Sequence, residues 1–210
     1  MARPKIHDAA TAEVLLDAAM KLLRVGGPDA VSLRAVADAS ERSVRAVYAL
    51  FGSKQALIDA LAARGYATLS TRVNALPRGG DAADELVAVG VEGFRGFAIE
   101  DPQMFRLTFE QVSAEVLQQP QVAKASHGAY TALASRVAAA READAIHESR
   151  SDVSCIFAFH SLCQGLAGGE LSARPAPEGA GFWRMMHGSD WQAEWRAAIG
   201  ALVRGFAEPA

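Results

Sequence analysis

The sequence predicts an all-α protein of about nine helices, with a small N-terminal three-helix domain and a larger helical domain after it. Three observations predict this fold class. Ala and Leu are abundant, no segment alternates polar and apolar residues with the period of a strand, and Gly and Pro gather at a few breaks. Between the breaks, apolar residues recur with the spacing of one helix face.

Turn and cap residues divide the first part of the chain into three short helices. A Gly-Gly-Pro turn ends the first helix, and a serine at the N-cap position begins each of the next two. The predicted helices cover residues 11–25, 33–39 and 43–51. Together they form a predicted domain over residues 1–52.

The breaks in the rest of the chain separate six longer helices. Asp101-Pro102 is a typical helix start, because a cap is followed by Pro at the first helical position. The predicted helices lie at residues 54–73, 84–100, 102–117, 120–143, 151–171 and 191–207. They form the second predicted domain, over residues 53–210.

Composition and charge narrow the class of protein. Half of the residues are hydrophobic and 21% are charged, as in ordinary globular proteins. No apolar stretch approaches the roughly 20 residues of a membrane span, and no leader pattern opens the chain, so we expect a cytoplasmic protein without a membrane partner. The net charge of −3 is distributed unevenly along the chain. Residues 1–65 hold nine Lys or Arg and seven Asp or Glu, whereas residues 66–210 hold twelve Lys or Arg and seventeen Asp or Glu.

Two short helices joined by a tight turn and packed on a longer one match a helix-turn-helix. The inner face of the helix over 43–51 carries large apolar residues that anchor it, and its outer face is available to DNA. Helix N-termini and hydroxyl groups suit phosphates. The predicted DNA-binding residues are Ser32, Arg34, Arg42, Ser43, Val44, Arg45, Ala46, Tyr48, Ala49 and Lys54. By pattern alone, three amphipathic helices with a solvated face are an equally good interpretation.

Two runs of this region resemble the DNA-binding domain of the tetracycline-repressor (TetR) family. They are Val31-Ser-Leu-Arg-Ala-Val-Ala and the run over residues 43–57, in which Tyr48-x-x-Phe-x-Ser-Lys54-x-x-Leu is the most specific part. The resemblance covers roughly residues 8–60. It implies that Tyr48 and Lys54 contact the DNA backbone and that Ser32 begins its helix near a phosphate.

The resemblance also implies partners for the whole chain. These are a double-stranded, (pseudo)palindromic DNA operator, a second copy bound through the last two long helices, and a small-molecule effector. The implied function is a repressor whose operator affinity falls when the effector binds. The alternative is a helix-turn-helix regulator that is constitutive or activating and has no small-molecule effector.

The chain departs from the family pattern in the turn and in the reading helix. The family's turn usually carries Gly and a small apolar residue, but this chain has Glu41-Arg42, and a carboxylate near phosphates is unfavourable unless an arginine neutralises it. Ala49 and Leu50 stand where His and Tyr are frequent. Arg45 is the best candidate for a bidentate guanine contact, and its alternatives are a solvated arginine or a partner of Glu41.

Aromatic and Met side chains concentrate in the second predicted domain, and we expect them to line a pocket for an apolar or aromatic effector. Core packing is the alternative for each of them, and His160 is either a hydrogen-bonded core histidine or a ligand contact. The predicted ligand-binding residues are Phe94, Phe97, Met104, Phe105, Phe109, Phe159, His160, Cys163 and Trp183.

Two segments of this domain resemble the C-terminal region of a TetR subgroup named for a Trp-His-Gly signature. They lie at residues 101–109 and 157–166. The match is partial, because Phe157 and Ser161 stand near where Trp and Gly are expected. This resemblance implies a sensor domain and does not name its ligand.

Catalytic and metal-binding patterns are missing from the sequence. We find no Glu-x-x-His pair, no His-Glu-x-x-His, no phosphate-binding Gly-rich loop and no nucleophile elbow, so we expect neither an enzyme nor a cofactor. Cys155, His160 and Cys163 are spaced i, i+5 and i+8, and on a straight helix they cannot converge on one zinc ion. We expect no metal site and reduced cysteines.

Overall fold

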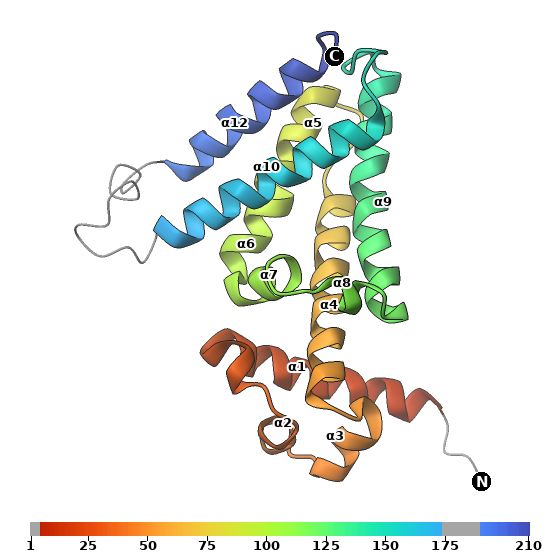
Figure 1. Ribbon diagram of the computed structural model, residues 1–210, viewed down its shortest axis with the longest axis vertical. Helices are drawn as coiled ribbons and strands as arrows, with labels where there is room; N and C mark the ends of the chain where they lie inside the picture. The colour runs from red at the N-terminus through yellow and green to blue at the C-terminus, as the bar shows by residue number, and fades with distance from the viewer. Residues whose placement is uncertain (1–4, 174–189) are drawn as a thin grey trace. The chain divides into compact units, whose positions relative to one another are not determined.

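The computed structural model describes residues 5–173 and 190–210, and these residues form helices and connecting loops without strands, which confirms the all-α class (Figure 1). None of the helices in these ranges has the length and apolar character needed to span a bilayer. In chain order they are α1 (Lys5–Ala30), α2 (Leu33–Ala39), α3 (Val44–Phe51), α4 (Lys54–Ala75), α5 (Ala82–Ala88), the π-helix η1 (Val89–Arg95), α6 (Gly96–Glu100), α7 (Pro102–Phe109), α8 (Ala114–Leu117), α9 (Pro120–Glu142), α10 (Asp152–Ala173) and α12 (Trp191–Phe206).

The chain forms two compact units that interleave in sequence. Unit 1 comprises Met1–Ala67 and Asp101–Ser126, and unit 2 comprises Thr68–Glu100 and His127–Ala210. Helices α4 and α9 therefore each contribute residues to both units. The predicted domain boundary at residue 52 stays a prediction.

In unit 1, α1 packs against α2, α3 and α7. Its apolar stripe buries Leu15, Ala19 and Leu23 completely, as the spacing of these residues predicts. The helical path is interrupted at Gly27, which has φ 66° and ψ −168°, a conformation that favours glycine. The predicted end of the first helix at the Gly-Gly-Pro turn is therefore seen as a kink within α1.

Asp101 fixes α7 to α1 in unit 1. Its Oδ1 caps α7 by accepting the Met104 N–H at 3.3 Å, and its Oδ2 accepts hydrogen bonds from Arg24 of α1 at 2.8 Å and 2.7 Å. Asp101 is only 7% exposed, so this charge is stabilised by its partners rather than by water. The predicted start of a helix at Asp101-Pro102 is confirmed.

The predicted single helix over 102–117 is wrong. Helix α7 ends at Phe109, where the Gln111 N–H turns back to the Arg106 carbonyl at 3.1 Å instead of continuing the helical ladder. Ser113 then caps the separate short helix α8. Glu110, Gln111 and Ser113 lie at this break, and Ser in particular favours caps and turns over the helix interior.

In unit 2, the predicted helix over 84–100 is a continuous path of α5, η1 and α6 with a π-helical middle. Helix α12 packs on α5 and η1, and it lies beside α10 (Figure 1). The approach of η1 to α12 is close, because a Cβ at Gly90 would lie 2.9 Å from Ile199 Cγ1. Glycine at this position therefore allows the two helices to pack.

The C-terminal end of α4 in unit 2 is closed by Arg136, a buried arginine of α9. Its guanidinium donates to the Val73, Leu76 and Pro77 carbonyls at 2.9, 2.6 and 2.7 Å, and to the Glu85 carboxylate at 2.9 Å. The last carbonyls of a helix have no partner within the helix. Arg136 supplies that partner from another helix.

Gly65 lets α4 and α7 approach closely in unit 1. A Cβ built at Gly65 would lie 1.9 Å from Thr108 Oγ1 and 3.3 Å from Met104 Sδ. We therefore expect Gly65→Ala to destabilise the protein by about 1–3 kcal/mol, as overpacking of a filled core does, despite the higher helix propensity of Ala. Urea unfolding monitored by circular dichroism measures this change.

Gly128 provides the matched control. It also lies within a helix, but a Cβ there would meet only Ser70 Oγ, at 3.9 Å. Gly128→Ala should leave the stability unchanged or raise it by up to about 1 kcal/mol. Equal effects of the two substitutions would show that the α4–α7 contact is not filled as described.

Candidate nucleic-acid interface

Helices α2 and α3 begin at the two predicted serine caps. Ser32 Oγ accepts the Ala35 N–H at 3.1 Å, and Ser43 Oγ accepts the Ala46 N–H at 3.2 Å. Each cap satisfies one of the free N–H groups of its helix and leaves others at the N-terminus. Val47 is fully buried and anchors α3, with α2 and α3 packed on each other.

The outer face of α3 is open to solvent. Val44, Arg45, Tyr48 and Ala49 are exposed, at i, i+1, i+4 and i+5, and Ala46 beside them is half-buried. Tyr48 is 62% exposed and Val44 45%, which is unusual for side chains of their size and apolar character. The structure thus brings the predicted reading residues onto one uncovered stripe.

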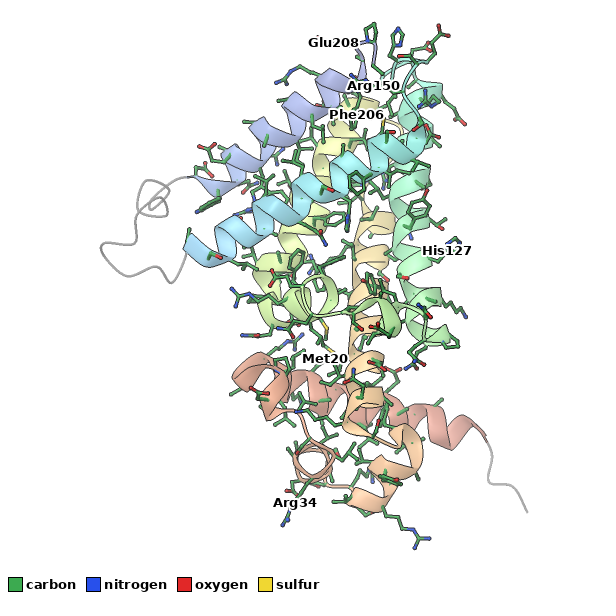
Figure 2. All side chains as sticks on the ribbon, viewed as in Figure 1. Met20, Arg34, His127, Arg150, Phe206 and Glu208 are labelled. Carbon is green, nitrogen blue, oxygen red and sulfur yellow. The ribbon has the colours of Figure 1, made fainter. Side chains whose placement is uncertain are left out.

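Four predicted cations of this region form no ion pair within the described residues: Arg34 on α2, Arg42 in the turn, Arg45 in the stripe itself and Lys54 at the start of α4. All four are exposed, and Figure 2 shows the Arg34 side chain extending from α2 into solvent. Two other arginines of unit 1 are engaged instead. Arg24 binds Asp101, and Arg64 binds Asp17 at 2.6 Å. The cations around α3 are therefore free for an external anion.

The turn between α2 and α3 has a left-handed residue at Glu41, with φ 55°. The Arg42 N–H after it donates to the Ala37 carbonyl at 2.9 Å, which closes the turn. This conformation is easy for glycine and costs other residues roughly 1–2 kcal/mol. The Glu41 side chain is exposed and forms no ion pair with Arg42 or Arg45 in the described ranges. One alternative for Arg45, a partner of Glu41, is thereby removed.

The predicted ligand-binding residues fall into both units. Phe94, Phe97, Phe159, His160 and Cys163 belong to unit 2. The Phe94 ring lies edge-on to the Phe159 ring at 6.3 Å and to the His160 ring at 5.7 Å. All but His160 are 2% exposed or less. Burial lowers the pKa of His160 and raises the pKa of Cys163, so both side chains are neutral near pH 7.

Met104, Phe105 and Phe109 belong to unit 1, where the Phe109 ring lies 4.9 Å from the Phe105 ring and 5.5 Å from the Tyr66 ring. Trp183 lies outside the described residues. A side chain that faces a large cavity keeps exposed surface on that side. Met104 and Phe105 are 2% exposed or less, so in this conformation they pack as core.

A buried polar cluster in unit 2 was not predicted. Glu170 of α10 is fully buried and accepts hydrogen bonds from Arg95 Nε at 2.9 Å, Arg95 Nη2 at 3.0 Å and Trp195 Nε1 at 3.0 Å. It joins η1, α10 and α12. Glu170 could have been noticed in the sequence, since it is an acid that follows a long run of uncharged residues in one helix. A buried acid of this kind needs a partner of opposite charge or a hydrogen-bond donor.

Within residues 5–173 and 190–210, no group of three His, Cys, Asp or Glu side chains is arranged to hold a metal ion. Cys155 and Cys163 are both buried free thiols.

Replacing Glu41 by Gly should stabilise unit 1 by about 0.5–1 kcal/mol. The removed left-handed strain of roughly 1–2 kcal/mol is partly offset by the greater entropy that Gly loses on folding. Glu41→Ala removes the same charge but keeps the Cβ, so it should show no such gain. Urea unfolding of the three proteins measures the difference. If the Ala and Gly variants gain equally, charge rather than backbone conformation is responsible.

The helix-turn-helix segment matches a known family. Residues 15–61 match the model described as bacterial regulatory proteins, tetR family. No curated protein sequence matches the chain.

The whole chain is similar in fold to solved structures. A protein of unknown function from Rhodococcus sp. RHA1 is 22% identical with a TM-score of 0.77, covering 94% of this chain and 95% of that one. PfmR, a TetR family transcriptional regulator from Thermus thermophilus, is 17% identical with a TM-score of 0.61, covering 90% and 97%. The multidrug binding protein EbrR, solved with imidazole, is 19% identical with a TM-score of 0.58, covering 95% and 93%. The chain thus shares the fold of these proteins, and its helix-turn-helix segment matches the N-terminal domain of the tetR family of bacterial regulatory proteins.

Proposed function

We propose that this chain is a sequence-specific DNA-binding regulator of bacterial transcription, which acts in the cytoplasm as a repressor. The observation that carries the proposal is the uncovered outer face of α3. Arg45 on this face, and Arg34, Arg42 and Lys54 on the neighbouring segments, form no ion pair among the described residues, and the whole segment matches a family of regulatory proteins. A positively charged surface of this kind around a short anchored helix suits the major groove and its flanking phosphates.

The side chains of this surface have different proposed roles. Arg45 is long enough and free to form two hydrogen bonds with guanine O6 and N7, and Val44 and Ala49 offer apolar contact to a thymine methyl group. Tyr48, Lys54, Arg34 and the N-termini after Ser32 and Ser43 bind phosphates, and so position the helix. Arg42 offsets the repulsion between Glu41 and the DNA.

The proposed regulator is a homodimer that binds a (pseudo)palindromic operator, with α10 and α12 of each copy at the interface. Two-fold symmetry in the protein then matches two-fold symmetry in the DNA. The proposed effector is a small apolar or aromatic molecule. EbrR, which shares this fold, is a multidrug binding protein, and this supports ligand binding by the fold. We also assign the second domain to the Trp-His-Gly subgroup on its two sequence segments.

A second candidate is a constitutive or activating regulator without a small-molecule effector. The complete burial of the predicted sensing residues favours it, since Phe94, Phe97, Met104, Phe105, Phe159 and Cys163 are packed as core. The two candidates share the DNA-binding surface. They differ in whether any compound changes operator affinity.

Arg45→Ala and Lys54→Ala should separate base reading from phosphate binding. Arg45→Ala should lower affinity for a selected operator by about 5–150-fold, the effect of 1–3 kcal/mol, and lower affinity for random duplex far less. Lys54→Ala should weaken both by similar factors and reduce the log–log salt slope by about 0.9, the value for one phosphate. Fluorescence anisotropy over a salt series measures both quantities.

Lys124→Ala is the matched control, because Lys124 is an exposed lysine of α9 away from α2 and α3. It should change neither affinity nor slope. Wild-type protein that binds no duplex, selected or random, would contradict the proposed function. If Arg45→Ala lowers the affinity for operator and for random duplex by the same factor, Arg45 contacts a phosphate rather than a base.

An effector found by thermal-shift screening should weaken operator binding by about 5–150-fold, and operator should weaken effector binding by the same factor. His160→Ala should reduce effector affinity and leave operator affinity of the free protein unchanged, because His160 is a half-buried polar side chain among buried rings and is not on the DNA surface. Calorimetric titration with and without operator measures both. No response to any aromatic or lipophilic compound would favour the constitutive candidate.

A further inference from the structure

Helix α10 is uncharged around its whole circumference. From Val153 to Gly169 it contains no Asp, Glu, Lys or Arg. One side of the helix is buried in unit 2, with Cys155, Phe159 and Cys163 exposed by 1% or less. A helix that is apolar on all faces is normally covered on all faces. Among the residues that the structure describes, however, the opposite side of α10 is exposed.

The open side carries a large aromatic residue. Val153, Phe157, Ser161 and Gly165 are exposed at intervals of four, so they form one stripe along the helix. Phe157 is 72% exposed and Val153 66%. Nothing lies within 4 Å of a Cβ built at Gly165. Phe157 is therefore the largest exposed side chain of this stripe, and Ser161 and Gly165 beyond it are small.

A groove runs beside this stripe, between α10 and α12. Its volume is about 410 Å³, and Ala158 of α10 and Ala201, Leu202 and Gly205 of α12 line it. Ala201 is exposed, and a Cβ at Gly205 would meet nothing within 4 Å. The groove is thus mainly apolar, although Arg150 and Ser154 also line it, and its volume is large enough for an aromatic ring.

Arg150, the cation among the described residues that line the groove, is already engaged in hydrogen bonds. Arg150 donates from Nε to the Glu208 carbonyl at 2.8 Å and from Nη2 to the Pro209 carbonyl at 3.2 Å. Figure 2 shows Arg150, Phe206 and Glu208 together at this end of unit 2. The guanidinium of Arg150 is thus occupied within its own chain, and the mainly apolar rest of the lining favours an apolar occupant over a charged one.

We propose that the groove of one copy receives Phe157 of a second copy, and that its own Phe157 enters the partner's groove. The projection and the hollow lie on adjacent sides of α10, since Phe157 and Ala158 are consecutive residues, about 100° apart around the helix. A two-fold interface requires such a self-complementary face, because the same patch meets itself. The inference rests on the proposed dimer and names the contact that holds it.

Sedimentation velocity without DNA tests the contact. Wild-type protein should be dimeric at micromolar concentration, and Phe157→Ala should weaken the dimer by at least about 100-fold, because two buried aromatic anchors are lost at once. Tyr130→Ala is the matched control: Tyr130 is an exposed aromatic residue of α9, 46% exposed, outside the face. It should leave the dimer unchanged. Circular dichroism verifies that each variant is folded.

A mixing experiment tests the groove itself. Ala201→Phe should fill the groove and block self-association, while its Phe157 remains in place. Mixed with Phe157→Ala protein, it should form a heterodimer: its Phe157 enters the open groove, and its filled groove faces the position without a ring. Two variants that fail alone should therefore associate together.

Three results would overturn the proposal. They are a monomeric wild-type protein, an unchanged dimer of Phe157→Ala, and two self-association-deficient variants that remain monomeric when mixed. All three are measured without DNA, so failure of this contact is distinguishable from failure of operator binding. A dimer that binds no DNA supports the contact and counts against the proposed function.

Discussion

The close contact of Gly65 with Thr108 organises unit 1. It leaves no room for a side chain on α4, and it brings α7 against the same helix that follows the α2–α3 reading surface in sequence. The ion pair of Arg24 with Asp101 fixes α7 to α1 as well. Residues 101–126 therefore belong to the unit that holds α1, α2 and α3. Helix α7 packs on α1, and α1 packs on α2 and α3, so a displacement of α7 would reach the proposed DNA-binding surface through α1.

The proposed DNA-binding surface was predictable because its determinants are local. A serine cap forms hydrogen bonds within three residues, and an apolar residue one turn into the helix fixes which face is buried. Ser32, Ser43 and Val47 therefore set the bounds and orientation of α2 and α3 without reference to the rest of the chain. The departure of Glu41 from the family's usual Gly also concerns local backbone conformation, since the left-handed backbone at this position suits glycine best.

The remainder was not predictable from local patterns, because its partners are distant in sequence. Glu170 meets Arg95 and Trp195, and Arg136 meets the end of α4, only after the helices assemble. The residues predicted to line one effector pocket are divided for a related reason. Phe97 and Phe105 are close neighbours in sequence, yet the boundary at Glu100 assigns them to different units. Nearness along the chain is a poor guide once a helix breaks.

The packing of the aromatic residues bears on how an effector would act. An effector that binds among Phe94, Phe159 and His160 must first separate rings that are in contact. If the conformation with separated rings is a small fraction of the population, the apparent affinity for the effector is reduced by that fraction. A compound must also prefer this conformation if it is to shift the equilibrium at all. The Glu170–Arg95–Trp195 cluster joins η1, α10 and α12, and the three rings lie on η1 and α10. Separating the rings by moving these helices would therefore work against the cluster. Effector sensing in this protein would then be a competition between ligand contacts and this buried cluster.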